Sequence, residues 1–299
     1  VVVSFTGAMG LTLNGRGFED GVPAVYRALS ATPEASDGAA HAIMTTDTVK
    51  KEGAVATTVG GKTVRMGGIA KGSGMIHPNM GTMLCFLTTD CAISPEMIKT
   101  ALLETVNVSF NRISVDGDTS TNDSCIVLAN GMAGNPVITE KGGDYAAFLE
   151  ALQALCMTLA KKMASDGEGA KHLITCTVKG AKDEGQAETV AKSVISSTLT
   201  KAAIFGADAN WGRVLCAIGY SGAPVDVNKI DVQFASKAGT ILVCETGAGV
   251  DFSEEQAKKI LLEHEIEILI DLKSGEASST AWGCDLTYDY VKINGDYRT

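Results

Sequence analysis

The residues best suited to chemistry lie in one short segment, residues 71–82, which runs directly into the apolar stretch 83–89. The apolar stretch predicts a buried strand, and the glycines before it predict a loop. Thr82 therefore stands where a loop enters a strand. A threonine hydroxyl is a poor nucleophile without an adjacent base, and no histidine stands in an obvious Ser-His or Thr-His arrangement with it.

Thr82 gains its own base if the bond between Gly81 and Thr82 is cut. The new α-amino group has a pKa of about 7.7–8.0 and lies within reach of the hydroxyl of the same residue. Gly81 suits this chemistry, because glycine tolerates the strained backbone that attack on its own carbonyl requires. The segment therefore allows self-cleavage and an N-terminal threonine nucleophile, while a threonine at the start of a strand is, taken alone, more often structural.

Further blocks extend this pattern along the chain, at residues 42–48, 110–123, 167–169, 207–213 and 294–299. Together with residues 71–82 they resemble, in the same order, the blocks of the ornithine acetyltransferase family, the glutamate N-acetyltransferases of arginine biosynthesis. Two features differ from the family. Gly81 stands where the family usually has alanine. Residues 1–10 resemble a mid-domain block and lack an initiator methionine, so we expect an N-terminal portion of the natural protein to be missing.

The resemblance implies an α/β fold, a layered αββα sandwich like that of N-terminal nucleophile hydrolases. A smaller C-terminal α/β domain is expected, with a tail that returns to the active site. We place the sandwich domain at residues 1–170 and the smaller domain at 171–299. The implied reaction moves an acetyl group from N2-acetylornithine to glutamate through an acetyl ester of Thr82, without a cofactor or metal. Two cleaved fragments are expected to assemble as an α2β2 heterotetramer.

The resemblance also implies the site residues. Thr82 is the nucleophile, and Thr6 and Gly7 form the oxyanion hole. The substrate pocket is expected to contain Thr45, Lys71, Thr82, Glu168, Asn294 and Thr299. An ammonium and hydroxyls suit an α-carboxylate, and a carboxylate suits the cationic side chain of ornithine.

Two other functions stay open at this point. The same scaffold can serve an aminopeptidase or amidase, with water as the acceptor, although the Thr45, Lys71, Glu168 and Asn294 set argues against it. The chain can also be an inactive fragment or a binding subunit. Acetyl-CoA is a possible second donor, but its phosphorylated adenosine favours a basic patch or a glycine-rich helix start. This acidic chain shows neither clearly, so N-acetylornithine is expected to be the better donor.

Two loops resemble ligand sites without matching them. Residues 67–74 fail the phosphate-loop pattern, because Lys71 precedes the glycine that it should follow. Residues 116–127 begin like a calcium loop but have Thr121 and Val127 where a glycine and a bidentate acid belong. Asp116 to Asp123 are therefore interpreted as a turn stabilised by side-chain to backbone hydrogen bonds.

Composition narrows the partners and the compartment. The formal charge is −10, which argues against nucleic acid or an anionic membrane as partner. No apolar run approaches the roughly 20 residues that a membrane helix needs. The 8 cysteines are scattered without a CxxC pair, which disfavours a zinc site or a disulfide framework and favours a reducing cytoplasm.

Hydrophobic patterns predict alternating strands and helices. Strands are expected to end at residue 3 and to cover 63–66, 83–88, 113–115, 125–129, 172–178, 231–234, 240–244 and 265–271. Helices are expected from Ser94-Pro95-Glu96 towards 111, over 145–164 and 184–198, and from a capping box at 253–256.

Overall fold

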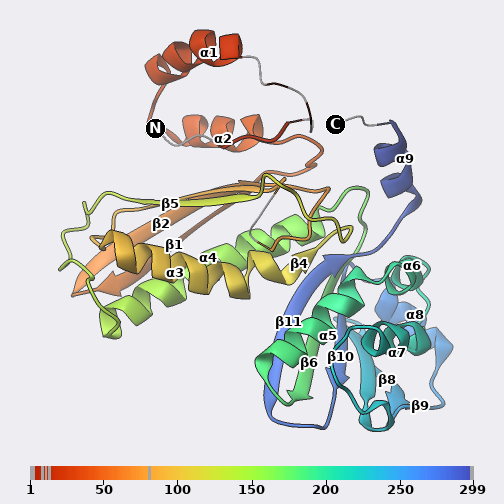
Figure 1. The fold of residues 1–299 in the computed structure, drawn as a ribbon. Helices are drawn as coiled ribbons and strands as arrows, with labels where there is room; N and C mark the ends of the chain where they lie inside the picture. The colour runs from red at the N-terminus through yellow and green to blue at the C-terminus, as the bar shows by residue number, and fades with distance from the viewer. Residues whose placement is uncertain (1–3, 8–9, 11, 13–14, 80–81, 297–299) are drawn as a thin grey trace.

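The computed structural model describes residues 4–7, 10, 12, 15–79 and 82–296. A four-stranded sheet of order β1-β2-β3-β5 forms the centre of its first part (Figure 1). The strands are β1 (Lys51–Val59), β2 (Lys62–Lys71), β3 (Leu84–Thr89) and β5 (Ser124–Ala129). β1, β2 and β3 are antiparallel neighbours, whereas β5 runs parallel to β3. The end of β2 and the starts of β3 and β5 therefore lie at the same edge of the sheet.

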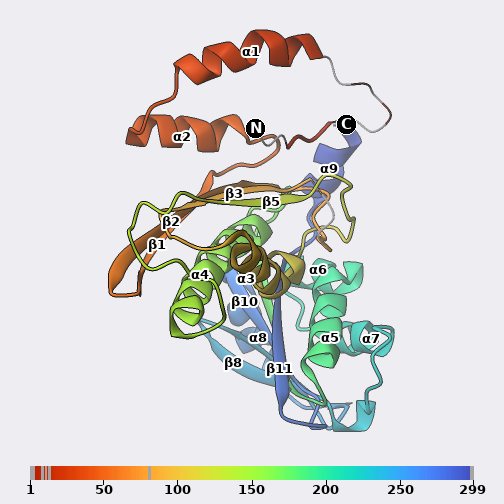
Figure 2. The ribbon, with the colours of Figure 1, turned by 60° about the vertical axis from the view of Figure 1, so that its left-hand side comes forward.

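Two helices cover one face of this sheet, α3 (Pro95–Val108) and α4 (Gly143–Ser165) (Figure 2). α3 begins as predicted, because the Ser94 hydroxyl accepts a hydrogen bond from the Met97 N–H at 3.3 Å and Pro95 fills the first turn. α4 buries one apolar stripe at three- and four-residue spacing, formed by Phe148, Leu152, Leu155 and Leu159. Both helices share the core of the sheet.

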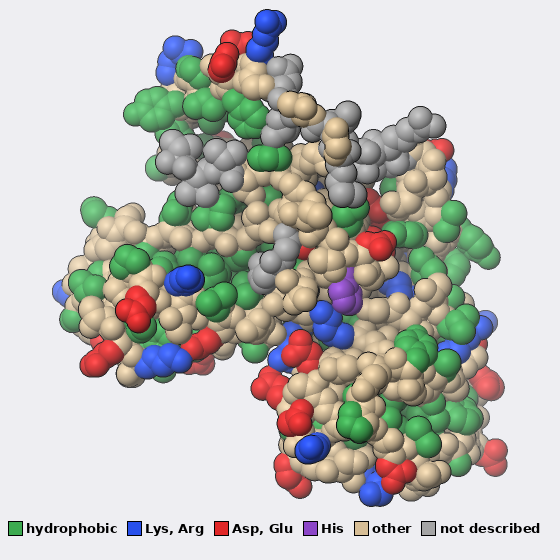
Figure 3. Space-filling view, in the orientation of Figure 1, with side chains coloured by type: hydrophobic (Ala, Val, Ile, Leu, Met, Phe, Trp, Pro, Cys, Tyr) green, Lys and Arg blue, Asp and Glu red, His purple; other side chains and the backbone are tan. Residues whose placement is uncertain are grey.

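A helical pair, α1 (Gly15–Arg27) and α2 (Pro33–Ala42), lies over the other face of the sheet in both ribbon views (Figures 1 and 2). α2 buries Ala40 only, and α1 buries none of its residues. Figure 3 shows α1 at the top of the molecule, with hydrophobic side chains gathered on its lower side and charged ones on its upper side. Phe18, Val22, Val25 and Tyr26 of α1 line one shallow depression together with Leu29, which follows the helix.

A second sheet of seven strands forms the C-terminal part, in the order β4-β11-β6-β10-β7-β8-β9. Its strands are β4 (Ile113–Ser114), β6 (Leu173–Ala181), β7 (Asp231–Ser236), β8 (Gly239–Glu245), β9 (Ala248–Gly249), β10 (Glu265–Asp271) and β11 (Ala277–Cys284). Four helices share one apolar core with it: α5 (Glu184–Ser196), α6 (Thr198–Phe205), α7 (Trp211–Gly219) and α8 (Glu254–Leu261). Short 3-10 turns occupy Phe110–Arg112 and Val227–Lys229.

The two parts are joined by more than a linker. β4 comes from the first part but pairs with β11, where Trp282 stands opposite Ile113. Trp282 and Leu173 belong to the core of the first part. The last helix, α9 (Tyr288–Asp296), returns towards the first part, where the Thr287 hydroxyl donates to the Gly169 carbonyl at 2.8 Å. The domain division at residue 170 stays a prediction.

Most elements expected from the sequence are present, and the α/β class is confirmed. The predicted helices at 145–164 and after residue 253 match α4 and α8, whereas the one at 184–198 continues as a second helix, α6. Strands β1 and β11 and helices α1, α2, α7 and α9 escaped prediction. β11 is rich in alanine and serine, which weaken an alternating pattern, and β1 has two valines as its only large apolar residues. The strand predicted to end at residue 3 lies outside the described residues.

A buried lysine joins three segments beneath the sheet edge. Lys51 is fully buried, and its Nζ lies 2.6 Å from both Asp47 Oδ1 and Asp166 Oδ2. Asp47 Oδ1 also accepts from the Gly72 N–H at 2.7 Å, while Asp166 Oδ2 accepts from the Thr48 N–H at 3.0 Å. The start of β1, the end of β2 and the end of α4 are therefore held by one ammonium group.

We expect Lys51→Met to lower the free energy of unfolding by about 3–5 kcal/mol, because it removes the ion pairs of two buried carboxylates and leaves Asp47 only the more distant charge of Lys71. Urea unfolding of the two proteins measures this difference. Lys50→Met is the matched control, since Lys50 pairs with Asp37 and Glu52 near the surface. Its loss is expected to stay within about 1 kcal/mol. Equal losses in the two variants would contradict a special role for the buried lysine.

Candidate active site

The strand register brings Lys71, Thr82 and Asp123 to the same end of the sheet. The sequence predicted the first two as site residues, and the structure adds the third. Lys71, at the end of β2, pairs with Leu84, and Leu84 pairs in parallel with Ser124. Thr82 precedes β3 by two residues, and Asp123 directly precedes β5. The side chains of Lys71 and Asp123 therefore approach Thr82 from its two neighbouring strands.

Lys71 is the cation of this site. Its side chain is almost fully buried, and its Nζ donates to Thr45 Oγ1 at 2.9 Å and to the Thr82 carbonyl oxygen at 3.3 Å. Burial lowers the pKa of Lys71, against the opposing charges of Asp47, Glu168 and Asp123. An ammonium has three donors, and two of them have partners among the described residues, so a third can meet a substrate oxygen.

Asp123 was missed by sequence analysis, which assigned it to a turn. Its Oδ1 accepts hydrogen bonds from the Thr82 N–H and, at 2.9 Å, from the Met83 N–H. Its Oδ2 is buried and has no hydrogen-bond partner among the described residues. Burial raises the pKa of Asp123 to about 6, although the Met83 N–H and the Lys71 charge oppose the rise.

Glu168 and Asn294 form a second group next to the glycine-rich loop. The Asn294 Nδ2 donates to Glu168 Oε2 at 2.7 Å, and the Glu168 N–H donates to the Ser73 carbonyl at 2.9 Å. Gly74 lies so close that a Cβ atom there would overlap the Glu168 carboxylate. The C-terminal helix α9 thus contacts Glu168, which lies against the loop between Lys71 and Thr82.

The predicted oxyanion residues are less closely placed. Thr6 is half-buried and Gly7 is exposed. Their segment is attached beside the site, because Asn122 Nδ2 donates to the Phe5 carbonyl at 3.2 Å. Gly81 and Thr299 lie outside the described residues. The structure thus brings Thr45, Lys71 and Thr82 into contact and pairs Glu168 with Asn294. The segment of Thr6 and Gly7 contacts Asn122 through the Phe5 carbonyl.

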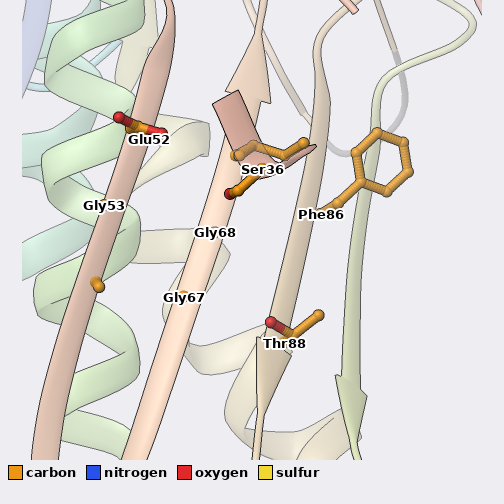
Figure 4. A pocket seen from close by; sticks show the side chains of 9 residues that line it. Ser36, Glu52, Gly53, Gly67, Gly68, Phe86 and Thr88 are labelled. Carbon is orange, nitrogen blue, oxygen red and sulfur yellow. The ribbon is translucent and has the colours of Figure 1, made fainter. Parts of the chain in front are cut away.

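A depression on the sheet face below α2 is separate from this group (Figure 4). Its volume is about 570 Å³. Ser36, Glu52 and Phe86 contribute to its lining, together with the glycines of β1 and β2. Glu52 is the one ionisable side chain among its lining residues, so it offers little for catalysis.

Other kinds of site find no support in the described part of the chain. Its His, Cys, Asp and Glu side chains form no group of three able to hold a metal ion. All eight cysteines are free thiols. Among residues 4–7, 10, 12, 15–79 and 82–296, no helix is long and apolar enough to cross a membrane.

The α/β fold and this collection of buried ammonium, hydroxyl and carboxylate groups define an α/β enzyme for a small polar substrate. The model of the ArgJ family matches residues 1–299. The chain therefore belongs to the ArgJ family. This confirms the family relationship and the fold class that the sequence indicated.

Curated relatives are similar over nearly the whole chain. The arginine biosynthesis bifunctional protein ArgJ of Caldanaerobacter subterraneus subsp. tengcongensis is 50% identical over 299 residues, which cover 100% of this chain and 74% of the relative. The protein of the same name from Symbiobacterium thermophilum is 51% identical, with 99% and 72% covered. A crystal structure of ArgJ from Bacillus halodurans is 47% identical and superposes with a TM-score of 0.68, covering 71% of this chain and 98% of that one.

We expect Gly74→Ala to loosen α9, because the new Cβ displaces the Glu168 carboxylate from Asn294. Losing one charge-assisted hydrogen bond costs about 1.5–3 kcal/mol, so amide exchange in α9 should accelerate by about tenfold to a hundredfold. Hydrogen exchange followed by mass spectrometry measures this. Gly142→Ala is the matched control, since no described atom lies within 4 Å of a Cβ at that position. Unchanged exchange in α9 of Gly74→Ala would refute this link.

Proposed function

We propose that this chain cuts itself between Gly81 and Thr82 and then transfers an acetyl group from N2-acetylornithine to glutamate through an acetyl ester of Thr82. The contact of Lys71 Nζ with both Thr45 Oγ1 and the Thr82 carbonyl carries this proposal. It puts a buried cation beside the nucleophile, where an amino-acid carboxylate can bind. Membership of the ArgJ family supports the same activity.

The substrate is oriented by charge at two ends. Lys71 and the Thr45 hydroxyl receive the α-carboxylate, which ornithine and glutamate share. The Glu168 carboxylate, held by Asn294 at 2.7 Å, receives the side-chain ammonium of N-acetylornithine. The Thr299 region, which follows α9, completes this end of the pocket in our proposal. Both half-reactions then use one carboxylate site, so donor and acceptor occupy it in turn.

The chemistry is a double displacement. Thr82 Oγ attacks the acetyl carbonyl carbon while the free α-amino group of Thr82 takes the hydroxyl proton. The amide bond breaks, its nitrogen receives that proton, and ornithine leaves. Glutamate then attacks the ester through its amine, restoring the Thr82 hydroxyl. In this proposal Thr6 and Gly7 stabilise the oxyanion of both steps, an effect worth about 3–4 kcal/mol for a donor of this kind.

The cleaved fragments are proposed to stay together and to form an α2β2 heterotetramer. β2 precedes the cut and β3 follows it, yet residues 66–71 and 84–89 pair as antiparallel neighbours. The sheet therefore holds the fragments after the peptide bond is gone. Free thiols at all eight cysteines support a reducing cytoplasm as the working compartment.

We expect the purified chain to separate into two fragments at the Gly81–Thr82 bond, and Thr82→Ala to stay in one piece because the attacking hydroxyl is gone. Intact mass spectrometry gives the fragment masses. Thr45→Ala serves as a control, since it removes a pocket hydroxyl and leaves the nucleophile. An active wild-type protein that persists as a single uncut chain would refute the mechanism.

We expect initial rates at several glutamate concentrations to give parallel double-reciprocal lines with N-acetylornithine as donor, because the acetyl group waits on Thr82. The Thr82 fragment should gain the mass of one acetyl group when glutamate is absent. Intersecting lines without this mass gain would indicate direct transfer. Rapid release of acetate into water would favour the amidase alternative. Acetyl-CoA is proposed as a much weaker donor, and comparing kcat/KM for the two donors tests that expectation.

A further inference from the structure

We propose that Asp123 carries the proton during self-cleavage, taking it from the Thr82 hydroxyl and delivering it to the Thr82 nitrogen as the peptide bond breaks. This inference rests on the proposed self-cleavage at Gly81–Thr82 and assigns its acid–base group. The uncut chain needs such a group, because the α-amino base of Thr82 does not exist until the bond is broken.

The contact geometry places Asp123 at one of the reacting atoms, the Thr82 nitrogen. Its Oδ1 already accepts the N–H of Thr82, the nitrogen that must leave, and the Met83 N–H holds the same oxygen at 2.9 Å. The parallel pairing of β3 and β5 fixes this approach, since the Ser124 N–H also donates to the Met83 carbonyl at 3.0 Å. The carboxyl group cannot move away without leaving the N–H groups of Thr82 and Met83 without this partner.

The second oxygen of Asp123 is free to act. Oδ2 is buried without a hydrogen-bond partner among the described residues, and the residue as a whole is 8% exposed. A buried carboxylate oxygen without a partner lowers stability. Such a group therefore indicates a role other than holding the fold together.

Asp116 shows what a purely structural carboxylate looks like in the same loop. It binds two successive amides at the other end of the loop, with Oδ2 accepting from the Met75 N–H at 2.7 Å and Oδ1 from the Ile76 N–H at 3.0 Å. Both of its oxygens are occupied, and Oδ2 also accepts from the Tyr290 hydroxyl at 3.2 Å. Asp123 makes the same double contact at Thr82 but keeps one oxygen unused.

The proposed step balances without any further reactant. Thr82 Oγ forms a bond to the Gly81 carbonyl carbon, and its proton passes to Asp123 Oδ2. The carbon–nitrogen bond then breaks, its electron pair stays on the Thr82 nitrogen, and the nitrogen takes the proton from Asp123. The acyl group has moved from nitrogen to oxygen, and Asp123 is a carboxylate again. Water hydrolyses the resulting ester, which gives the Gly81 carboxylate and restores the hydroxyl.

The environment of Asp123 suits a proton carrier. Burial raises its pKa to about 6, with the Met83 N–H and Lys71 opposing the rise. A carboxylate with a raised pKa is ionised at neutral pH and is a stronger base than an ordinary aspartate. Lys71 lies on the other side of Thr82, bound to its carbonyl oxygen, and leaves the nitrogen to Asp123.

The test compares cleavage rates of uncut full-length chains, purified rapidly in the cold and followed by intact mass spectrometry. Asp123→Asn keeps the shape and an oxygen for the two N–H groups but cannot carry a proton, so cleavage should slow by about a hundredfold or more. Asp116→Asn is the matched control, because it weakens the other anchor of the same loop, and it should cleave within a few-fold of wild type. Formate should restore part of the rate to Asp123→Ala, and Asp123→Glu should cleave faster than Asp123→Asn.

Three results would overturn the proposal. Asp123→Asn could cleave at the wild-type rate, or Asp123→Asn and Asp116→Asn could cleave equally slowly with equal losses in Tm. The third is that formate leaves the cleavage rate of Asp123→Ala unchanged. Wild-type protein that never cleaves marks a different failure, that of the proposed self-cleavage itself, and removes the step that Asp123 is assigned to. Thermal unfolding of each variant separates loss of fold from loss of proton transfer.

Discussion

The buried ammonium group of Lys51 fixes the backbone segments that position the candidate site. Lys51 holds Asp47 and Asp166 at 2.6 Å each, and through Asp47 it also fixes the Gly72 amide at the start of the glycine-rich loop. A buried charge is tolerated only when it is paired and hydrogen-bonded, so these three segments must meet for any of them to be buried. The position of Lys71, next to Gly72, follows from this constraint, because the backbone that carries it cannot shift without uncovering the ion pairs.

The strand register turns this fixed edge into a candidate catalytic site. Antiparallel pairing sets Lys71 beside Leu84, and parallel pairing sets Leu84 beside Ser124. A cation and a carboxyl group are thereby delivered to opposite sides of Thr82 by backbone hydrogen bonds, with little reliance on loop conformation. Sites built on strands hold their geometry better than sites built on loops. The same pairing explains how a chain cut between β2 and β3 can keep its site, because the sheet joins the two pieces.

Sequence reasoning identified the segment that carries Thr82 and the helix that starts at Ser94, since both depend on neighbours in the chain. It missed Asp123 as a partner of Thr82, because the two residues are 41 apart in the chain and their contact depends on β3 and β5 being parallel neighbours. Local sequence gave Asp123 only the features of a turn residue. The Asn294–Glu168 bond joins residues 126 apart, and the family resemblance named both residues without indicating that they touch. β11 escaped because its small residues take strand form only through the neighbours they pair with, and β1 escaped because two valines are its only large apolar residues.

The proposed self-cleavage would change the charge at this end of the sheet. Before the cut, the Thr82 nitrogen is a neutral amide that donates to Asp123; afterwards it is an amine that can bind a proton. The Asp123 carboxylate favours the ammonium form of that amine, and the ammonium of Lys71 favours the free base. In the uncut chain the Met83 N–H holds Asp123 and Lys71 binds the Thr82 carbonyl, so the two opposing charges flank the group that the cut would create. Lys71 and Asp123, which flank the uncut bond, would thus also set the protonation of the Thr82 amine that serves as base in acetyl transfer. The proposed self-cleavage and the proposed acetyl transfer would then depend on the same arrangement of three strand ends.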